Sequence, residues 1–190
     1  MKKYKLTNET IHVDGYTLHR IEALTHFSDV YKGDKGGFVE SEDNLSQKGD
    51  CWIYGTAKVY GNAMVYGNAR ICDNAEVYGD ASVYNNASIS DNAKVCGNAE
   101  VYGDAIIYGR AEVGGDAKVA SDSDYIVFKN CWSSGRYFTW TRSNNMWKVG
   151  CFHGTGEELI AKAYKDSELS GREYERVVKY VESILKDSRK

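Results

Sequence analysis

The stretch VYGNAMVYGNARICDNAEVYGD, residues 59–80, repeats nearly the same six residues. The register continues on both sides as eleven uninterrupted hexapeptides from Ile53 to Lys118: IYGTAK, VYGNAM, VYGNAR, ICDNAE, VYGDAS, VYNNAS, ISDNAK, VCGNAE, VYGDAI, IYGRAE and VGGDAK. GDCW, before Ile53, forms a weaker twelfth unit. A unit this short cannot bury its own apolar residues and stacks on its neighbours to do so. The repeat therefore predicts a solenoid.

Each position of the hexapeptide has a chemistry that suits a small β-coil. Val or Ile at the first position favours extended backbone and an inward side chain, and Ala at the fifth position fits a tight interior. Gly, Asp or Asn at the third position, and Asn or Asp at the fourth, tolerate left-handed backbone. Six residues are thus predicted to form one short strand and one corner.

A second period, of eighteen residues, indicates that three hexapeptides close one coil. Residues eighteen apart would then lie above one another at about 4.8 Å, the spacing of neighbouring strands. Two columns at this spacing are informative: the side chains of one alternate in charge, and the other consists of tyrosines. Their members are Lys58, Glu76, Lys94 and Glu112, and Tyr66, Tyr84 and Tyr102. We expect about four triangular coils, because twelve hexapeptides supply that number.

The pattern [VI]-Y-G-[ND]-A-x over residues 47–118 resembles the hexapeptide-repeat family of left-handed parallel β-helices. The resemblance implies the left-handed winding, which the residues alone do not. It also implies frequent association into trimers. Many members are acyltransferases that use acetyl-CoA or a related thioester, with a histidine on or beside the coils as the general base.

The chain divides into three predicted parts, at residues 1–46, 47–121 and 122–190. The first is a capping β-hairpin that turns at Asp14-Gly15, followed by a loop leading into the coils. The last is a small α+β domain, with YIVFK, RYFTWT and MWKVGCF as three strands and two helices after them. Thr155 is predicted to cap the first helix, and Ser170 with Glu173 forms a capping-box pattern for the second. We therefore expect a mainly β protein with helices at its carboxyl end.

Charge, apolar runs and cysteine usage indicate which partners, cellular location and bound groups to expect for this protein. The formal net charge of −3 argues against a nucleic-acid partner, and no apolar run approaches the length of a membrane span. Five dispersed cysteines without a CxxC pair or a signal peptide indicate reduced thiols and a cytoplasmic protein. In the eighteen-residue register Cys72 and Cys96 fall on different faces, and Cys51 takes an inward position. We therefore expect neither a metal site nor a cofactor.

Catalysis of the family's kind would require a histidine base, and the predicted coils contain none. His12, His19 and His26 lie in the predicted cap, and His153 lies in the C-terminal domain. We therefore assign no catalytic residue and favour a protein that is not an enzyme. An acyl-CoA-dependent acyltransferase stays open as an alternative.

The tyrosine column has two interpretations. Together with Met64 it forms an outward apolar stripe, and a soluble monomer does not normally leave such a stripe bare. The stripe either packs against the C-terminal helix or forms a subunit interface. We favour an interface formed by Met64, Tyr66, Tyr84 and Tyr102, in a homo-oligomer that the resemblance implies is a trimer.

A cluster of aromatic and basic residues lies in CWSSGRYFTWTRSNNMWKVGCFHGTGEE, residues 131–158. Aromatic rings can stack on a base, guanidinium groups can pair with phosphate, and a helix start offers backbone N–H groups to an anion. The ligand-binding candidates are Arg136, Trp140, Arg142, Trp147, His153 and Thr155. The alternative is that these aromatics form the core of a small sheet. Strand alternation places Phe138 and Trp140 opposite Thr139 and Thr141, and we expect only one of the two sides to be core.

These observations favour a non-enzymatic oligomeric scaffold that binds a small anionic molecule. The segments KGGFVESEDNLSQ and GCFHGTGEELI resemble uncharacterised proteins of phages and prophages of intestinal bacteria. That resemblance names no activity, but a phage origin together with the aromatic and arginine cluster leads to a hypothesis. We expect an anti-defence role in a bacterial host, in which the protein sequesters a nucleotide-type host signal. A protein-interaction module that inhibits a host protein is a further alternative.

Overall fold

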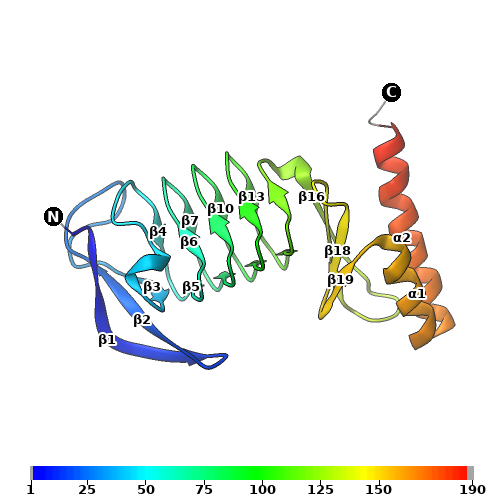
Figure 1. Ribbon diagram of the computed structural model, residues 1–190, viewed down its shortest axis with the longest axis horizontal. Helices are drawn as coiled ribbons and strands as arrows, with labels where there is room; N and C mark the ends of the chain where they lie inside the picture. The colour runs from blue at the N-terminus through cyan, green and yellow to red at the C-terminus, as the bar shows by residue number, and fades with distance from the viewer. Residues whose placement is uncertain (1, 188–190) are drawn as a thin grey trace.

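The computed structural model describes residues 2–187. It is an elongated molecule in which three parts follow one another along the long axis (Figure 1). An antiparallel hairpin lies at one end, a stack of β-coils forms the middle, and a small sheet with two helices forms the other end. The predicted order of hairpin, β-helix and α+β domain is therefore confirmed.

The coils have three faces, each a sheet of stacked short strands. The charged face contains β3 (Lys35–Val39), β5 (Lys58–Val59), β8 (Glu76–Val77), β11 (Lys94–Val95) and β14 (Glu112–Val113). The tyrosine face contains β6 (Met64–Val65), β9 (Ser82–Val83), β12 (Glu100–Val101) and β15 (Lys118–Val119). The third face contains β4 (Trp52–Ile53), β7 (Arg70–Ile71), β10 (Ser88–Ile89) and β13 (Ile106–Ile107).

The eighteen-residue register is confirmed on all three faces. Lys58 pairs in parallel with Glu76, Met64 with Ser82, and Arg70 with Ser88. Every first-position Val or Ile and every fifth-position Ala of the hexapeptides is at most 1% exposed. The interior is therefore a continuous column of aliphatic side chains, as the repeat predicts.

The third and fourth positions of the hexapeptide have separate roles. In all eleven units the third residue has positive φ, between 58° and 73°, including the non-glycine residues Asp73, Asn85 and Asp91. The fourth residue does not adopt this conformation. In five pairs of units its side chain bonds to the same position one coil further on. Asn62 donates to Asp80 at 2.8 Å, and Asn98 donates to Asp116 at 3.0 Å. The expectation of left-handed backbone is thus right for the third position and wrong for the fourth.

The solenoid begins earlier than residue 47 and has about five turns rather than four. β3 pairs in parallel with β5, and an isolated bridge joins Leu45 to Val65. Val39 and Leu45 fill the inward positions, although their sequence does not follow the hexapeptide pattern. The register there is twenty residues, so the pattern that identifies the later coils does not reach this one.

The N-terminal hairpin is confirmed and extends the sheet of the charged face. β1 (Tyr4–Val13) and β2 (Tyr16–Ala23) turn at Asp14-Gly15, where both residues have positive φ. β2 then pairs antiparallel with β3, so the parallel stack ends against the hairpin. The hairpin therefore covers one open sheet edge.

The described part of the C-terminal domain, residues 122–187, contains four strands rather than the predicted three. They are β16 (Tyr125–Lys129), β17 (Tyr137–Thr141), β18 (Met146–Val149) and β19 (Phe152–Gly154). The predicted strand MWKVGCF is divided by a turn at Gly150, which has a φ of 57°. The left-handed backbone at this glycine reverses the chain and makes two strands of one predicted run.

The two helices pack together on one side of this sheet. α1 (Gly156–Asp166) begins after Thr155, which is the predicted cap and forms a capping box with Glu158. α2 (Glu168–Asp187) begins earlier than predicted, so Ser170 lies inside it. Ser167 accepts from the Ser170 N–H at 3.1 Å and has the capping role predicted for Ser170. Neither described helix is long and apolar enough to cross a membrane.

Both sides of β17 are buried, and the expectation that only one side is core is wrong. Phe138 and Trp140 pack with the helices in one hydrophobic cluster. Thr139, on the opposite side, covers the last coil and accepts a hydrogen bond from the Glu112 N–H at 2.8 Å. Ser143 accepts from the Lys118 N–H at 2.7 Å. The last coil leaves backbone N–H groups without a further coil, and side-chain hydroxyls of the sheet satisfy them.

Candidate ligand-binding sites

The structure separates the six predicted ligand-binding residues. Arg136 lines an open groove beside the charged face. Trp140, Trp147 and Thr155 line a second cavity, on the helix side of the C-terminal sheet. Arg142 and His153 are exposed and line neither space. The predicted cluster is therefore not one site.

The two tryptophans belong to the core of the C-terminal domain. Trp140 is 1% exposed and Trp147 is 2% exposed, and the two are cross-strand partners. The Trp140 indole Nε1 donates to Asn145 Oδ1 at 3.0 Å. Their ring faces cannot stack on a nucleobase held at the surface, so the core interpretation holds for these rings.

The groove beside the charged face has a volume of about 620 Å³ and is formed by both the β-helix and the C-terminal domain. It is lined by Lys58, Asn74, Glu76, Asn92, Lys94, Arg110, Glu112, Gly135, Arg136, Tyr137 and Gly150. Four of these side chains are basic and two are acidic. The groove is therefore positively charged in a protein whose formal net charge is negative.

Ion pairing divides the basic residues of the groove into two classes. Glu76 accepts from Lys58 at 3.0 Å and from Lys94 at 2.8 Å, so these lysines share one carboxylate. Burial raises the pKa of Glu76, but the hydrogen bonds from the two lysines outweigh burial and leave the pKa below its ordinary value. Arg110 and Arg136 are exposed and have no carboxylate partner among the described residues. The arginines are therefore free to bind an anion.

Tyr137 lines the same groove and contacts Arg110. The Arg110 guanidinium carbon lies 5.5 Å from the centroid of the Tyr137 ring, and the Lys129 ammonium lies 5.6 Å from it. Both distances are within the range of cation–π attraction. The ring thus holds Arg110 at the groove without neutralising its charge.

Sequence reasoning missed Arg110, although a signal was present. The fourth position of the hexapeptide is Asn or Asp in nine of the eleven units, Thr at residue 56 and Arg at residue 110. Thr56, Asn74, Asn92 and Arg110 are spaced by eighteen and share one corner of the coil. At this corner Thr56 Oγ1 donates to Asn74 Oδ1 at 2.8 Å, whereas Arg110 contributes a cation. A departure from the repeat consensus therefore marks the groove.

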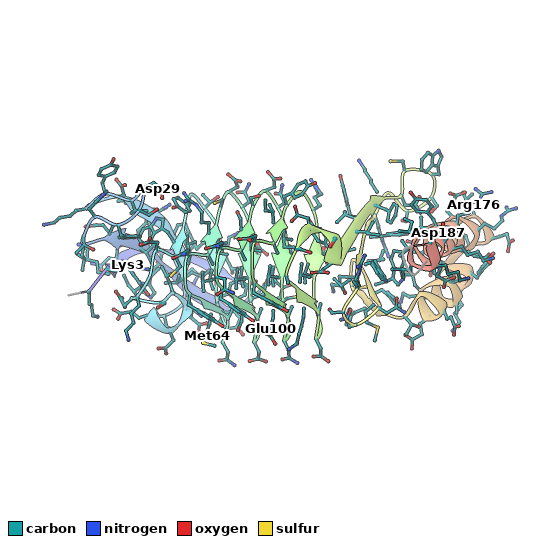
Figure 2. All side chains as sticks on the ribbon, turned by 90° about the horizontal axis from the view of Figure 1, so that it is seen from above. Lys3, Asp29, Met64, Glu100, Arg176 and Asp187 are labelled. Atoms are coloured by element: carbon teal, nitrogen blue, oxygen red, sulfur yellow. The ribbon has the colours of Figure 1, made fainter. Side chains whose placement is uncertain are left out.

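The tyrosine face carries the predicted column of rings. The centroids of Tyr66 and Tyr84 are 4.9 Å apart and those of Tyr84 and Tyr102 are 5.2 Å apart, with the rings nearly parallel. Tyr84 donates to Glu100 at 3.0 Å, and burial together with this carboxylate raises the pKa of Tyr84 to about 12. Met64 and Glu100 lie along the same side of the molecule (Figure 2).

Neither of the two described α-helices covers the tyrosine face. α1 and α2 lie beyond the C-terminal sheet, at the far end of the long axis (Figure 1). Met64 is 49% exposed and Tyr66 is 38% exposed. The alternative that the column packs against the C-terminal helix is therefore wrong.

The four histidines are dispersed, and none lies on an inward or outward position of the hexapeptide coils. His12 contacts Thr17, His19 contacts the Thr7 carbonyl, and the ring of His26 lies tilted against that of Tyr31. The ring of His153 lies over Gly115 at the last coil, where a Cβ on the glycine would collide with it. Within residues 2–187, no group of three or more His, Cys, Asp or Glu side chains could hold a metal ion.

Comparison with known proteins identifies the repeat. Residues 57–73 match the family model of the YdcK β-solenoid repeat. The protein named uncharacterized acetyltransferase YdcK, from Escherichia coli strain K12, is 39% identical to this chain over 62 residues. That match covers 28% of this chain and 19% of the relative, so the chain spans less than a fifth of the relative's length. The coils described above are a hexapeptide-repeat β-helix segment, similar to the repeat of that protein.

Proposed function

We propose that this protein is a binding scaffold that holds a small anionic molecule in the groove beside the charged face. The observation that carries the proposal is that Arg110 of the β-helix and Arg136 of the C-terminal domain line one groove without carboxylate partners among the described residues. Guanidinium groups form paired hydrogen bonds with phosphate oxygens. The rigid coils fix the position of one arginine relative to the other.

Within that class, we favour a phosphate-bearing ligand of the nucleotide type. The groove offers the amides of Asn74 and Asn92 and the ring of Tyr137 in addition to its cations. Amides bond to the edges of bases and sugars, and a tyrosine ring provides a stacking surface. If the chain comes from a phage, such a ligand would be a nucleotide-type signal of host immunity, which the protein would sequester.

Calorimetry of the purified chain with cyclic dinucleotides, ADP-ribose derivatives and inorganic phosphate tests this proposal. Loss of one charged hydrogen-bond donor should weaken binding by about tenfold or more, so Arg110→Ala and Arg136→Ala should each have that effect. Arg142→Ala is the matched control, because Arg142 is exposed outside the groove. If no anion of the panel binds, or if all three variants lose affinity equally, the groove is not the site.

We further propose that the scaffold self-associates through the tyrosine face, as a trimer. The exposed Met64 and Tyr66 side chains, and the stacked rings that continue from them, support this role. Glu100 pairs with Lys118 at 2.8 Å, so the charges of this face are balanced and a second copy would not be repelled. Native mass spectrometry should show trimers that Met64→Glu with Tyr66→Glu dissociates. Ile106→Glu, on the third face, should leave them intact, and a monomeric parent protein would refute the interface.

Acyl transfer is the second candidate function, and two observations favour it. The matched relative is named an acetyltransferase, and the exposed His153 lies against the last coil. Acyl transfer would require His153 to act as a base within hydrogen-bond reach of the acceptor. Acetyl-CoA should then raise the melting temperature, and His153→Ala should abolish CoA release. An absence of both effects would leave the non-catalytic scaffold.

A further inference from the structure

A further space adjoins the groove at the corner of the coil that holds Arg110, and we call it the corner pocket. Its volume is about 370 Å³. Arg110 and Tyr137 line both the corner pocket and the groove beside the charged face. A ligand whose anionic group binds at Arg110 can therefore extend from the groove into the corner pocket. The side chains that line it come from the corner after β13, from η2 (Asp122–Asp124), and from β16 and β17: Tyr108, Arg110, Asp122, Tyr125, Val127 and Tyr137.

One aromatic ring of the corner pocket lies open to a ligand. Tyr125 is buried and fixed in place, because its hydroxyl donates to the Ile106 carbonyl at 2.9 Å. Tyr108 is 58% exposed, and its side chain forms no hydrogen bond or ring contact with the other described residues. The ring of Tyr108 is therefore available to stack on a planar group.

Tyr54 lies in the same column of the third face, three coils before Tyr108, and its side chain has partners within the protein. Its hydroxyl donates to Asp29 at 2.9 Å, and the Arg70 guanidinium carbon lies 4.9 Å from its ring centroid. Asp29 and Arg70 also form an ion pair with each other. At this end of the column, an aspartate and an arginine thus satisfy the tyrosine and neutralise one another.

The corner pocket contains the same three residue types, but their charges are not paired. Arg110 and Asp122 line it with Tyr108, and no ion pair joins them among the described residues. Asp122 Oδ1 accepts from the Ile106 N–H at 2.8 Å, which fixes the position of the carboxylate. Its other oxygen has no hydrogen-bond donor among residues 2–187. A cation, an aromatic ring and a carboxylate oxygen are thus all open to one ligand.

We propose that the corner pocket binds the base of a nucleoside phosphate and prefers a base that carries an amino group. This inference rests on the proposed function of the groove, because the phosphate of the same ligand lies at Arg110. The base stacks on Tyr108, and its amino group donates to the free oxygen of Asp122. An ionised carboxylate only accepts hydrogen bonds, so it favours an amino group over a base atom that is itself an acceptor.

Calorimetry on the full chain with adenosine monophosphate and ribose phosphate tests the role of the ring. Adenosine monophosphate should bind at least about tenfold more tightly, since only this compound has a base to stack. Tyr108→Ala should remove the preference, and Tyr108→Phe, which keeps the ring, should restore it. Tyr31→Ala is the matched control, because Tyr31 is 64% exposed and lines neither space. Equal binding of the two compounds would overturn this inference while leaving the groove as an anion site.

Asp122→Asn tests the preference for an amino group. The variant keeps an oxygen for the Ile106 N–H but replaces the free oxygen by an NH₂ group, which cannot accept. It should weaken adenosine monophosphate by about tenfold relative to purine riboside monophosphate, which lacks the amino group. A change of equal size for both nucleotides, or no change, would show that Asp122 does not contact the base. If neither adenosine monophosphate nor ribose phosphate binds the parent protein, the proposed function of the groove and this inference both fail.

Discussion

The β-helix and the C-terminal domain are built by different rules. In the coils, each residue's environment follows from its place in a six-residue unit, and the neighbour above it is eighteen residues away. In the C-terminal domain, Trp140 and Thr139 are adjacent in sequence, yet one packs against helices and the other against the last coil. In the periodic coils, a residue's position in the repeat determines what surrounds its side chain. In the C-terminal domain, the packing of the sheet against the helices and the last coil determines it.

The two regions also differ in what they contribute to binding. The coils contribute regularly spaced side chains, and the informative one is the exception, Arg110. The C-terminal domain contributes Arg136 to the groove, whereas its Trp147 belongs to the core and lines the second cavity. The groove is formed where the two regions meet.

The largest change in stability should come from a substitution in the core of the C-terminal domain, which leaves the core of the β-helix intact. Trp140→Ala should destabilise the C-terminal domain by about 3–5 kcal/mol, because it leaves a cavity among Phe138 and the helices. The β-helix has its own cluster and should unfold at higher denaturant, so circular dichroism should show two transitions. A single transition shared by helix and strand signals would mean that the two regions unfold as one unit.

A smaller loss of stability is expected when a glycine at the third position of the hexapeptide is replaced. Gly97 has a φ of 68°, and a Cβ there would lie 3.0 Å from the Gly115 nitrogen. Gly97→Ala should therefore cost about 1–2 kcal/mol in free energy of unfolding. Gly97→Asn should cost less, because Asn85 occupies the same conformation in this chain. Chemical denaturation measures both, and an alanine that is tolerated better than asparagine would contradict the assignment.

The hydrogen bond between the last coil and the C-terminal sheet should contribute still less to the free energy of unfolding. Thr139→Val keeps the side-chain shape but removes the acceptor of the Glu112 N–H, at a cost of about 1 kcal/mol. Hydrogen exchange should show faster exchange at the Glu112 amide, while Thr141→Val leaves that amide protected. Unchanged protection in Thr139→Val would mean that the sheet does not seal the last coil.

The smallest effect concerns the ion pairs of the charged face and depends on pH. Because the folded pKa of Glu76 is lowered, its pairing with Lys58 and Lys94 stabilises the protein above the unfolded pKa of about 4.3. This contribution, about 0.5 kcal/mol for partly exposed pairs, disappears as the pH falls through the folded pKa. Glu76→Gln should therefore lower stability at neutral pH and have no effect at strongly acidic pH. Thermal unfolding over that range measures the difference, and a pH-independent loss would point to packing instead.

The amino-acid pattern alone was sufficient to predict the hexapeptide coils. Inward burial, left-handed corners and the eighteen-residue register all depend on the short-range geometry of the repeat. Tyr66 and Tyr84 stack as that register predicts. The pattern did not predict the first coil, because Val39 and Leu45 pair with residues twenty positions later instead of eighteen. In the C-terminal domain the pattern predicted the helices and most strand positions but not the turn at Gly150.

Only the tertiary structure decided where the candidate sites lie. The run that contains Arg136 and Trp147 reads as one cluster, but strand alternation and the helices behind the sheet direct these two residues to separate spaces. Which residue of another element faces each of them depends on how the sheet docks on the last coil and under α2. Those contacts join residues distant in sequence, so they cannot be predicted from a local sequence period.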